Sequence, residues 1–105
     1  MIEDRQIVIK YLTVSINGIY KILPLYEEKN IGVDTYVESL LFTLYGLDKA
    51  VLLEFSHEYV TVLATLESVK KEVVKENSNH SVLKREIFKC INIVKNMVAK
   101  LEEGE

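Results

Sequence analysis

The fold of this protein is decided by residues 81–102, which read SVLKREIFKCINIVKNMVAKLE. Apolar side chains recur there at every third or fourth position, namely Leu83, Ile87, Cys90, Val94, Met97 and Leu101. Residues three and four apart lie on one face of an α-helix, so this spacing predicts a long helix with one buried face. The opposite face is polar, which is typical of a helix at the surface of a bundle.

The residues directly before this segment predict a second long helix, over residues 48–76. Its apolar stripe consists of Leu52, Phe55, Tyr59, Val62, Leu66, Val69 and Val73. At 1.5 Å per residue this helix would be about 43 Å long. A short polar turn, residues 77–80, joins the two helices. Long helices joined by a short loop pack antiparallel, so the C-terminal half of the chain is predicted to form a helical hairpin.

The first half of the chain predicts two further helices, over residues 3–23 and 34–45. The apolar stripe of the first contains Ile2, Ile9, Leu12, Ile16, Ile19 and Leu23. The stripe of the second contains Val33, Val37, Leu40, Leu44 and Leu47. Pro24 is expected to end the first helix, because proline disfavours helical geometry at the residue before it.

Two aspartates are expected to begin helices. Asp34 is a candidate N-cap for the helix over residues 34–45, and Asp48 for the helix that follows. Leu47 and Leu52 flank Asp48 at the spacing of a hydrophobic staple.

These elements predict an all-α protein. We expect a single domain over residues 1–105: a small four-helix bundle with antiparallel coiled-coil-like packing, one short helix and a long C-terminal helical hairpin. β-branched residues are frequent and favour strands locally. The helical period is sustained over more than twenty residues, however, and outweighs that preference.

Composition excludes several classes of protein. The 105 residues are 49% hydrophobic and 28% charged, with a net charge of −3, which argues against general nucleic-acid binding. Cys90 is the only cysteine, so no intramolecular disulfide can form. No apolar run is long enough to span a membrane, and residues 1–5 do not resemble a signal peptide. The expected location is therefore cytoplasmic.

The first half of the chain has more apolar surface than one small bundle needs. Residues 34–45 are apolar nearly all round, and the apolar arc of residues 3–23 covers more than half of that helix. The other helices could enclose residues 34–45 within one chain, or both segments could present a second apolar face to another copy or another protein. The candidate interface residues are Ile7, Tyr11, Val14, Tyr36, Phe42 and Tyr45.

A cluster of basic residues surrounds the turn of the predicted hairpin. It comprises Lys70, Lys71, Lys75, Lys84, Arg85 and Lys89. Lysines late in a helix suit its negative C-terminal end, but this does not explain Lys84 and Arg85 at the start of the next helix. The cluster could bind a nucleic acid or an acidic partner.

Catalytic chemistry has little support in the sequence. Glu54 and His57 have the Glu-x-x-His spacing of di-iron bundles, but those proteins use two such motifs and this chain has one. Both residues fall on the face opposite the Leu66 stripe, where we expect solvent. Cys90 occupies an apolar stripe, which favours a structural cysteine over a nucleophile. We predict no catalytic residue, no metal site and no cofactor.

The sequence therefore predicts a non-enzymatic interaction protein, a regulator or adaptor that acts through helix packing. The expected partner is a second copy, giving a homodimer, or a heterologous protein; nucleic acid is disfavoured. The alternatives are a binding module that uses the basic cluster and a helical enzyme with a carboxylate-bound metal.

Overall fold

In the computed structural model of the chain, which describes residues 2–47 and 53–103, every regular element is a helix. The elements are α1 (Ile2–Tyr20), α2 (Ile22–Glu27), α3 (Val33–Tyr45), the short 3-10 helix η1 (Leu53–Phe55), α4 (Ser56–Val73) and α5 (His80–Glu103). The predicted all-α bundle is confirmed.

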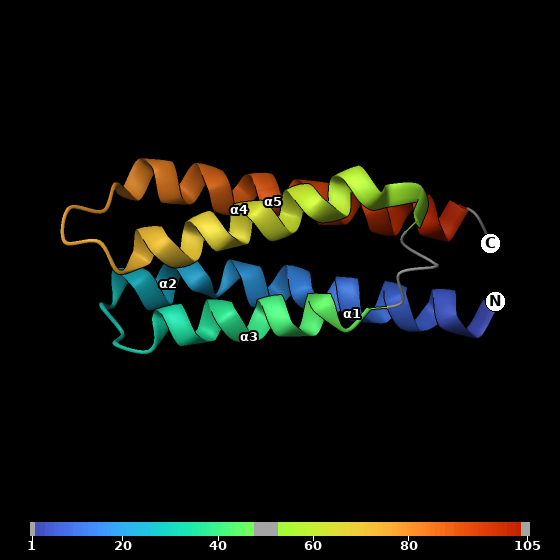
Figure 1. Cartoon of the computed structure of the whole chain (residues 1–105), viewed down its shortest axis with the longest axis horizontal. Helices are drawn as coiled ribbons and strands as arrows, with labels where there is room; N and C mark the ends of the chain where they lie inside the picture. The colour runs from blue at the N-terminus through green and yellow to red at the C-terminus, as the bar shows by residue number, and fades with distance from the viewer. Residues whose placement is uncertain (1, 48–52, 104–105) are drawn as a thin grey trace.

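The long helices alternate in direction (Figure 1). α1 and α2 run one way, α3 returns, α4 runs with α1, and α5 returns again. The start of α1 and the end of α5 therefore lie at one end of the bundle, where an Arg5 guanidinium nitrogen, Nη1, donates a hydrogen bond to the Leu101 carbonyl (3.4 Å). The α2–α3 and α4–α5 loops lie together at the other end.

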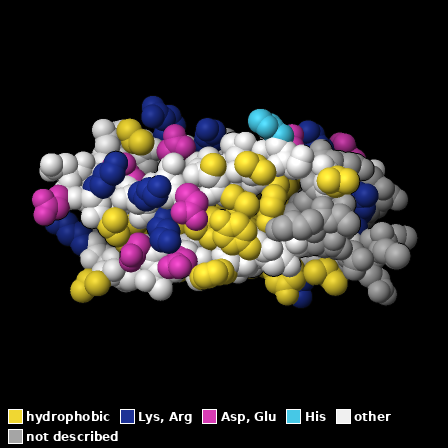
Figure 2. Space-filling model, viewed as in Figure 1, with side chains coloured by type: hydrophobic (Ala, Val, Ile, Leu, Met, Phe, Trp, Pro, Cys, Tyr) yellow, Lys and Arg dark blue, Asp and Glu magenta, His cyan; other side chains and the backbone are white. Residues whose placement is uncertain are grey.

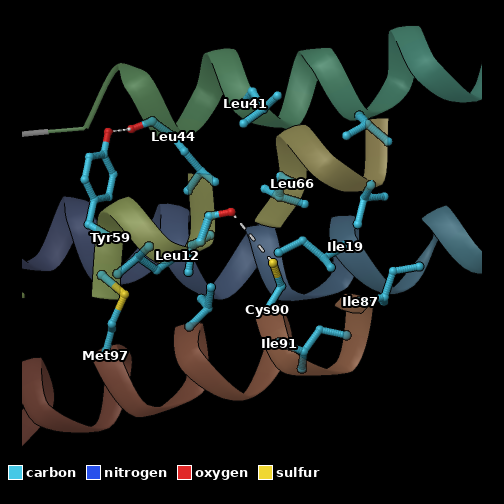
Figure 3. Packing of buried hydrophobic residues seen from close by; sticks show 14 of the residues in the cluster. Leu12, Ile19, Leu41, Leu44, Tyr59, Leu66, Ile87, Cys90, Ile91 and Met97 are labelled. Carbon is cyan, nitrogen blue, oxygen red and sulfur yellow. Dashed lines mark hydrogen bonds between the residues drawn. The ribbon is translucent and has the colours of Figure 1, made fainter. Parts of the chain in front are cut away.

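The two apolar stripes of the C-terminal hairpin form the centre of the core (Figure 3). All six stripe residues predicted for α5 are buried, and so are Phe55 of η1 and the α4 stripe residues from Tyr59 to Val69. Val73, at the last residue of α4, is partly buried. Tyr59 adds a buried hydrogen bond, because its hydroxyl donates to the Leu44 carbonyl at 2.6 Å.

The helix predicted over residues 48–76 is shorter in the structure. α4 begins at Ser56, after the 3-10 turn of η1, and ends at Val73. Its 18 residues span about 27 Å rather than the predicted length. The expected Asp48 cap and the Leu52 half of the staple lie outside the described residues.

The helix predicted over residues 3–23 is interrupted at Lys21, and the expectation that Pro24 ends it is wrong. Pro24 is the third residue of α2, which continues to Glu27. In an unbroken helix the Tyr20 carbonyl would accept a hydrogen bond from residue 24, but proline has no N–H. The break at Lys21 puts Pro24 in the first turn of a new helix, where that missing donor is tolerated.

α3 begins at Val33. The prediction that Asp34 is its N-cap is wrong. Gly32 occupies that position without a side-chain cap, while its own N–H donates to the Asn30 side chain at 2.9 Å. Asp34 lies in the first turn instead, where its charge suits the positive end of the helix.

The buried stripes of α1 and α3 differ in part from the predicted ones. Residues 8, 12, 15 and 19 of α1 and Ile22 of α2 are buried, so Val8, Ser15 and Ile22 replace the predicted residues 9, 16 and 23, which are partly buried. α3 buries Leu41 in place of Leu40. The apolar stripe of α3 is thus packed against other helices of the same chain.

Candidate interaction surface

Three candidate interface residues form an exposed row on α1. Ile7, Tyr11 and Val14 follow one another at spacings of four and three, and Gly18 continues the row. Gly18 faces α3, since a Cβ atom there would lie 2.7 Å from Leu40 Cδ2. The row therefore lies on the side of α1 towards α3, yet its three large side chains are 46–59% exposed.

The three candidates on α3 occupy different positions. Phe42 is 67% exposed on the outer side of α3, one turn after Glu38 and away from Tyr36 and Leu40, which approach α1. Tyr45 lies two turns after Glu38, which pairs with Lys70 of α4 at 3.8 Å, so Tyr45 lies on the α4 side.

Tyr36 belongs to the contact between α1 and α3 within the chain. Its hydroxyl donates to the Gly18 carbonyl at 2.7 Å, and burial raises the pKa of this tyrosine above its ordinary value. The structure therefore brings together three of the six predicted residues, Ile7, Tyr11 and Val14, on the side of α1 towards α3. We call this surface the α1–α3 apolar flank.

The predicted basic cluster does not share one face. Lys70 pairs with Glu38 of α3, and Lys75 pairs with Glu72 at 3.2 Å. Lys84 lies one turn before Phe88 of α5. The Phe88 ring packs edge-on against the Tyr20 ring of α1, with centroids 5.9 Å apart. Lys84 therefore lies on the side of the hairpin opposite the Lys70–Glu38 pair. The side chains of Lys71, Lys84, Arg85 and Lys89 are exposed.

Neither histidine takes part in a metal site in the described part of the chain. His57 is exposed on α4, and the Glu54 side chain lies outside the described part. His80 Nε2 lies 2.8 Å from Glu27 Oε2. Within residues 2–47 and 53–103, no group of three His, Cys, Asp or Glu side chains could hold a metal ion.

Cys90 is buried between α4 and α5. Its thiol Sγ lies 3.8 Å from the Val62 carbonyl, to which it donates a weak hydrogen bond (Figure 3). Burial raises the pKa of this thiol to about 12, with a smaller contribution from Glu86. The neutral thiol is a poor nucleophile, which agrees with the predicted structural role.

We expect Cys90 in the native protein to react with a disulfide reagent roughly 100-fold more slowly than in denaturing guanidinium chloride, because reaction requires local opening. Absorbance of the released thiolate measures both rates. Between pH 9.0 and about 12, the Cys90 thiol of the unfolded chain ionises while that of the folded protein stays neutral. The free energy of unfolding should therefore fall as the pH rises through this range. Equal rates in the two states would contradict this burial.

The structure also brings together polar residues that the sequence pattern did not single out as a site. Tyr26 and Glu27 of α2 meet Ser78 and His80 of the α4–α5 hairpin at the end of the bundle that carries both loops. Figure 2 shows charged side chains of both signs crowded at this end and apolar ones over the middle of the face in view. Two short loops in an alternating bundle must meet at one end, and this topology was the only available signal.

The fold and these surfaces define a small all-α bundle with an exposed apolar flank. No protein-family model matches the chain, and comparisons with curated proteins and with solved structures found no match either. None of the helices in the described part is long and apolar enough to cross a membrane.

Proposed function

We propose that this protein is a non-enzymatic interaction protein that self-associates through the α1–α3 apolar flank. The observation that carries this proposal is the exposure of three large apolar side chains on one flank, with Ile7 at 52% and Val14 at 59%. The core does not need them, because α1 and α3 already bury separate stripes within the chain.

The size of the flank suits the centre of a dimer interface. A stable interface buries about 800 Å² on each partner, around an apolar core with a polar rim. Three half-exposed large side chains would form the centre of such an interface, and the polar residues around them would form its rim. Twofold dimers are the commonest oligomers, and a twofold axis would place each flank against its own copy.

Absolute molar mass from light scattering tests this proposal. We expect a mass of twice the 12.1 kDa chain, held over an about tenfold range of concentration. The double variant Ile7→Ser, Val14→Ser should have the mass of one chain and unchanged helix content, because both side chains lie outside the core.

Val60→Ser is the matched control, since Val60 is 60% exposed on α4, away from the flank. That variant should keep the dimer mass. A single-chain mass for the unmodified protein at the highest concentration, or a dimer that survives the double substitution, would contradict self-association through this flank.

A further inference from the structure

A pocket of about 780 Å³ lies at the end of the bundle, between the α2–α3 loop and the α4–α5 loop. Its apolar lining comes from Ile31, Val33, Val73 and Val74, and charged residues including Lys29 and Glu76 also line it. It shares no residue with the α1–α3 apolar flank. Its volume falls within the range of binding sites for small molecules and peptide anchors.

Interactions between segments far apart in the sequence hold the walls of this pocket. The Tyr26 hydroxyl hydrogen-bonds to the Ser78 hydroxyl, and Glu27 contacts His80 at 2.8 Å. The His80 ring also stacks on the Tyr26 ring, with centroids 6.1 Å apart. On the hairpin side, the Asn79 N–H donates to the Glu72 carboxylate at 2.9 Å and lowers its pKa. The pocket is therefore formed before any ligand arrives, which reduces the entropy lost on binding.

Two large aliphatic side chains at this pocket are left in water. Ile31 is 98% exposed and Val74 is 60% exposed. A small molecule seated between the loops would leave the outer surface of Ile31 uncovered. A second polypeptide brings a surface of its own and can cover it, so the exposure of Ile31 favours a protein segment as the occupant.

Lys29 has a backbone conformation that glycine normally adopts. Its φ is 59°, and its N–H donates to the Tyr26 carbonyl while the next N–H, of Asn30, donates to Leu25. This is the arrangement that ends many helices, with glycine preferred at the left-handed position. A lysine there is strained, and such strain is often retained where the side chain is used.

The charges of the lining complement a segment that carries both signs. Glu27 is paired with His80, and Lys75 is paired with Glu72. Lys29 and Glu76 have no ion-pair partner within the described residues, so the pocket offers one free base and one free acid. With no net excess of charge, it has little to select a phosphate or a simple carboxylate.

We propose that this pocket docks a short segment of another protein, in which a large apolar side chain is flanked by one acidic and one basic residue. The apolar side chain lies against Ile31 and Val74, and the flanking charges pair with Lys29 and Glu76. Together with the self-associating flank, the protein then has two separate contact surfaces, as an adaptor requires.

A random heptapeptide library displayed on phage and selected against the full chain provides the test. Enriched sequences should share one large apolar residue with charges of both signs beside it. A synthetic peptide of the enriched sequence should shift the backbone NMR signals of residues 26–33 and 73–80. The double variant Ile31→Ser, Val74→Ser should bind it at least about tenfold more weakly and keep its fold, because both side chains are exposed.

Two substitutions of Lys29 separate the side chain from the backbone strain. Lys29→Gly relieves the strain, so its Tm should rise by about 2–5 °C while peptide affinity falls roughly 2–5-fold. Lys29→Ala keeps the strain and removes the ammonium group, so it should weaken binding equally without raising the Tm. Unchanged affinity in both variants would overturn the role of Lys29.

Absence of any enriched sequence, or peptides whose NMR shifts map to the α1–α3 apolar flank, would overturn the proposal. So would sedimentation of the protein with phosphatidylcholine–phosphatidylserine vesicles that depends on Ile31, because a lipid surface would then be the occupant. The molar mass of the Ile31→Ser, Val74→Ser variant keeps this test distinct from self-association: it should equal that of the unmodified protein, whatever that mass is.

Discussion

Leu66→Ala should lower the free energy of unfolding by about 2–5 kcal/mol. Leu66 is completely buried at the middle of α4, facing the centre of the bundle (Figure 3). Truncation to alanine removes apolar contacts on every side and leaves a cavity that long, close-packed helices cannot close. Small domains are stable by only about 5–15 kcal/mol, so this single change would remove a large share of the total.

His57→Ala is the matched control on the same helix. His57 is exposed, and we expect its substitution to change the unfolding free energy by less than about 0.5 kcal/mol. Urea unfolding followed by circular dichroism measures both variants, at one protein concentration and with comparable slopes. Similar midpoints for the two would show that the buried face of α4 has been assigned wrongly.

The C-terminal hairpin was predictable from sequence because its apolar and polar residues separate cleanly. In α5 the polar residues Lys89 and Asn96 lie opposite the stripe of Cys90 and Met97, so only one face can be buried. The spacing then determines both the helix and its orientation. All six predicted positions are buried in the structure.

The orientation of α1 was harder to predict because apolar residues follow one another directly. Ile7, Val8 and Ile9 are adjacent, and each could begin a stripe. The structure buries Val8 and also Ser15, whose hydroxyl donates to the Tyr11 carbonyl one turn earlier at 2.8 Å. A buried serine satisfied by its own helix gives no hydrophobic signal, so the pattern favoured its apolar neighbours.

The pocket at the loop end could not be predicted from spacing. Glu27 and His80 are separated by 53 residues, and each belongs to a different helical pair. Their contact depends on where α2 ends, and that end depends on the break at Lys21 and on the left-handed conformation of Lys29. Neither feature follows from an apolar period, which describes faces of helices and not their ends.

Leu41→Ala should likewise lower the free energy of unfolding by about 2–5 kcal/mol, and it tests the orientation of α3 directly. The apolar spacing predicted that Leu40 lies in the buried stripe, whereas the structure leaves Leu41 2% exposed and Leu40 partly buried beside Gly18. α3 has this orientation because Gly18 lets α1 approach α3 closely. Leu40 then fills the contact between the two helices, and Leu41 faces the core.

Leu40→Ala is the control, and its loss should be the smaller of the two, about 1–2 kcal/mol, because part of its surface already lies in water. Urea unfolding of both variants beside the unmodified protein gives the comparison. A larger loss for Leu40 would mean that α3 is rotated by one residue from the described position. The contact of Leu40 with Gly18, which places the row of Ile7, Tyr11 and Val14 on the side of α1 towards α3, would then also differ. The stability of two adjacent leucine variants therefore tests the surface from which self-association is proposed.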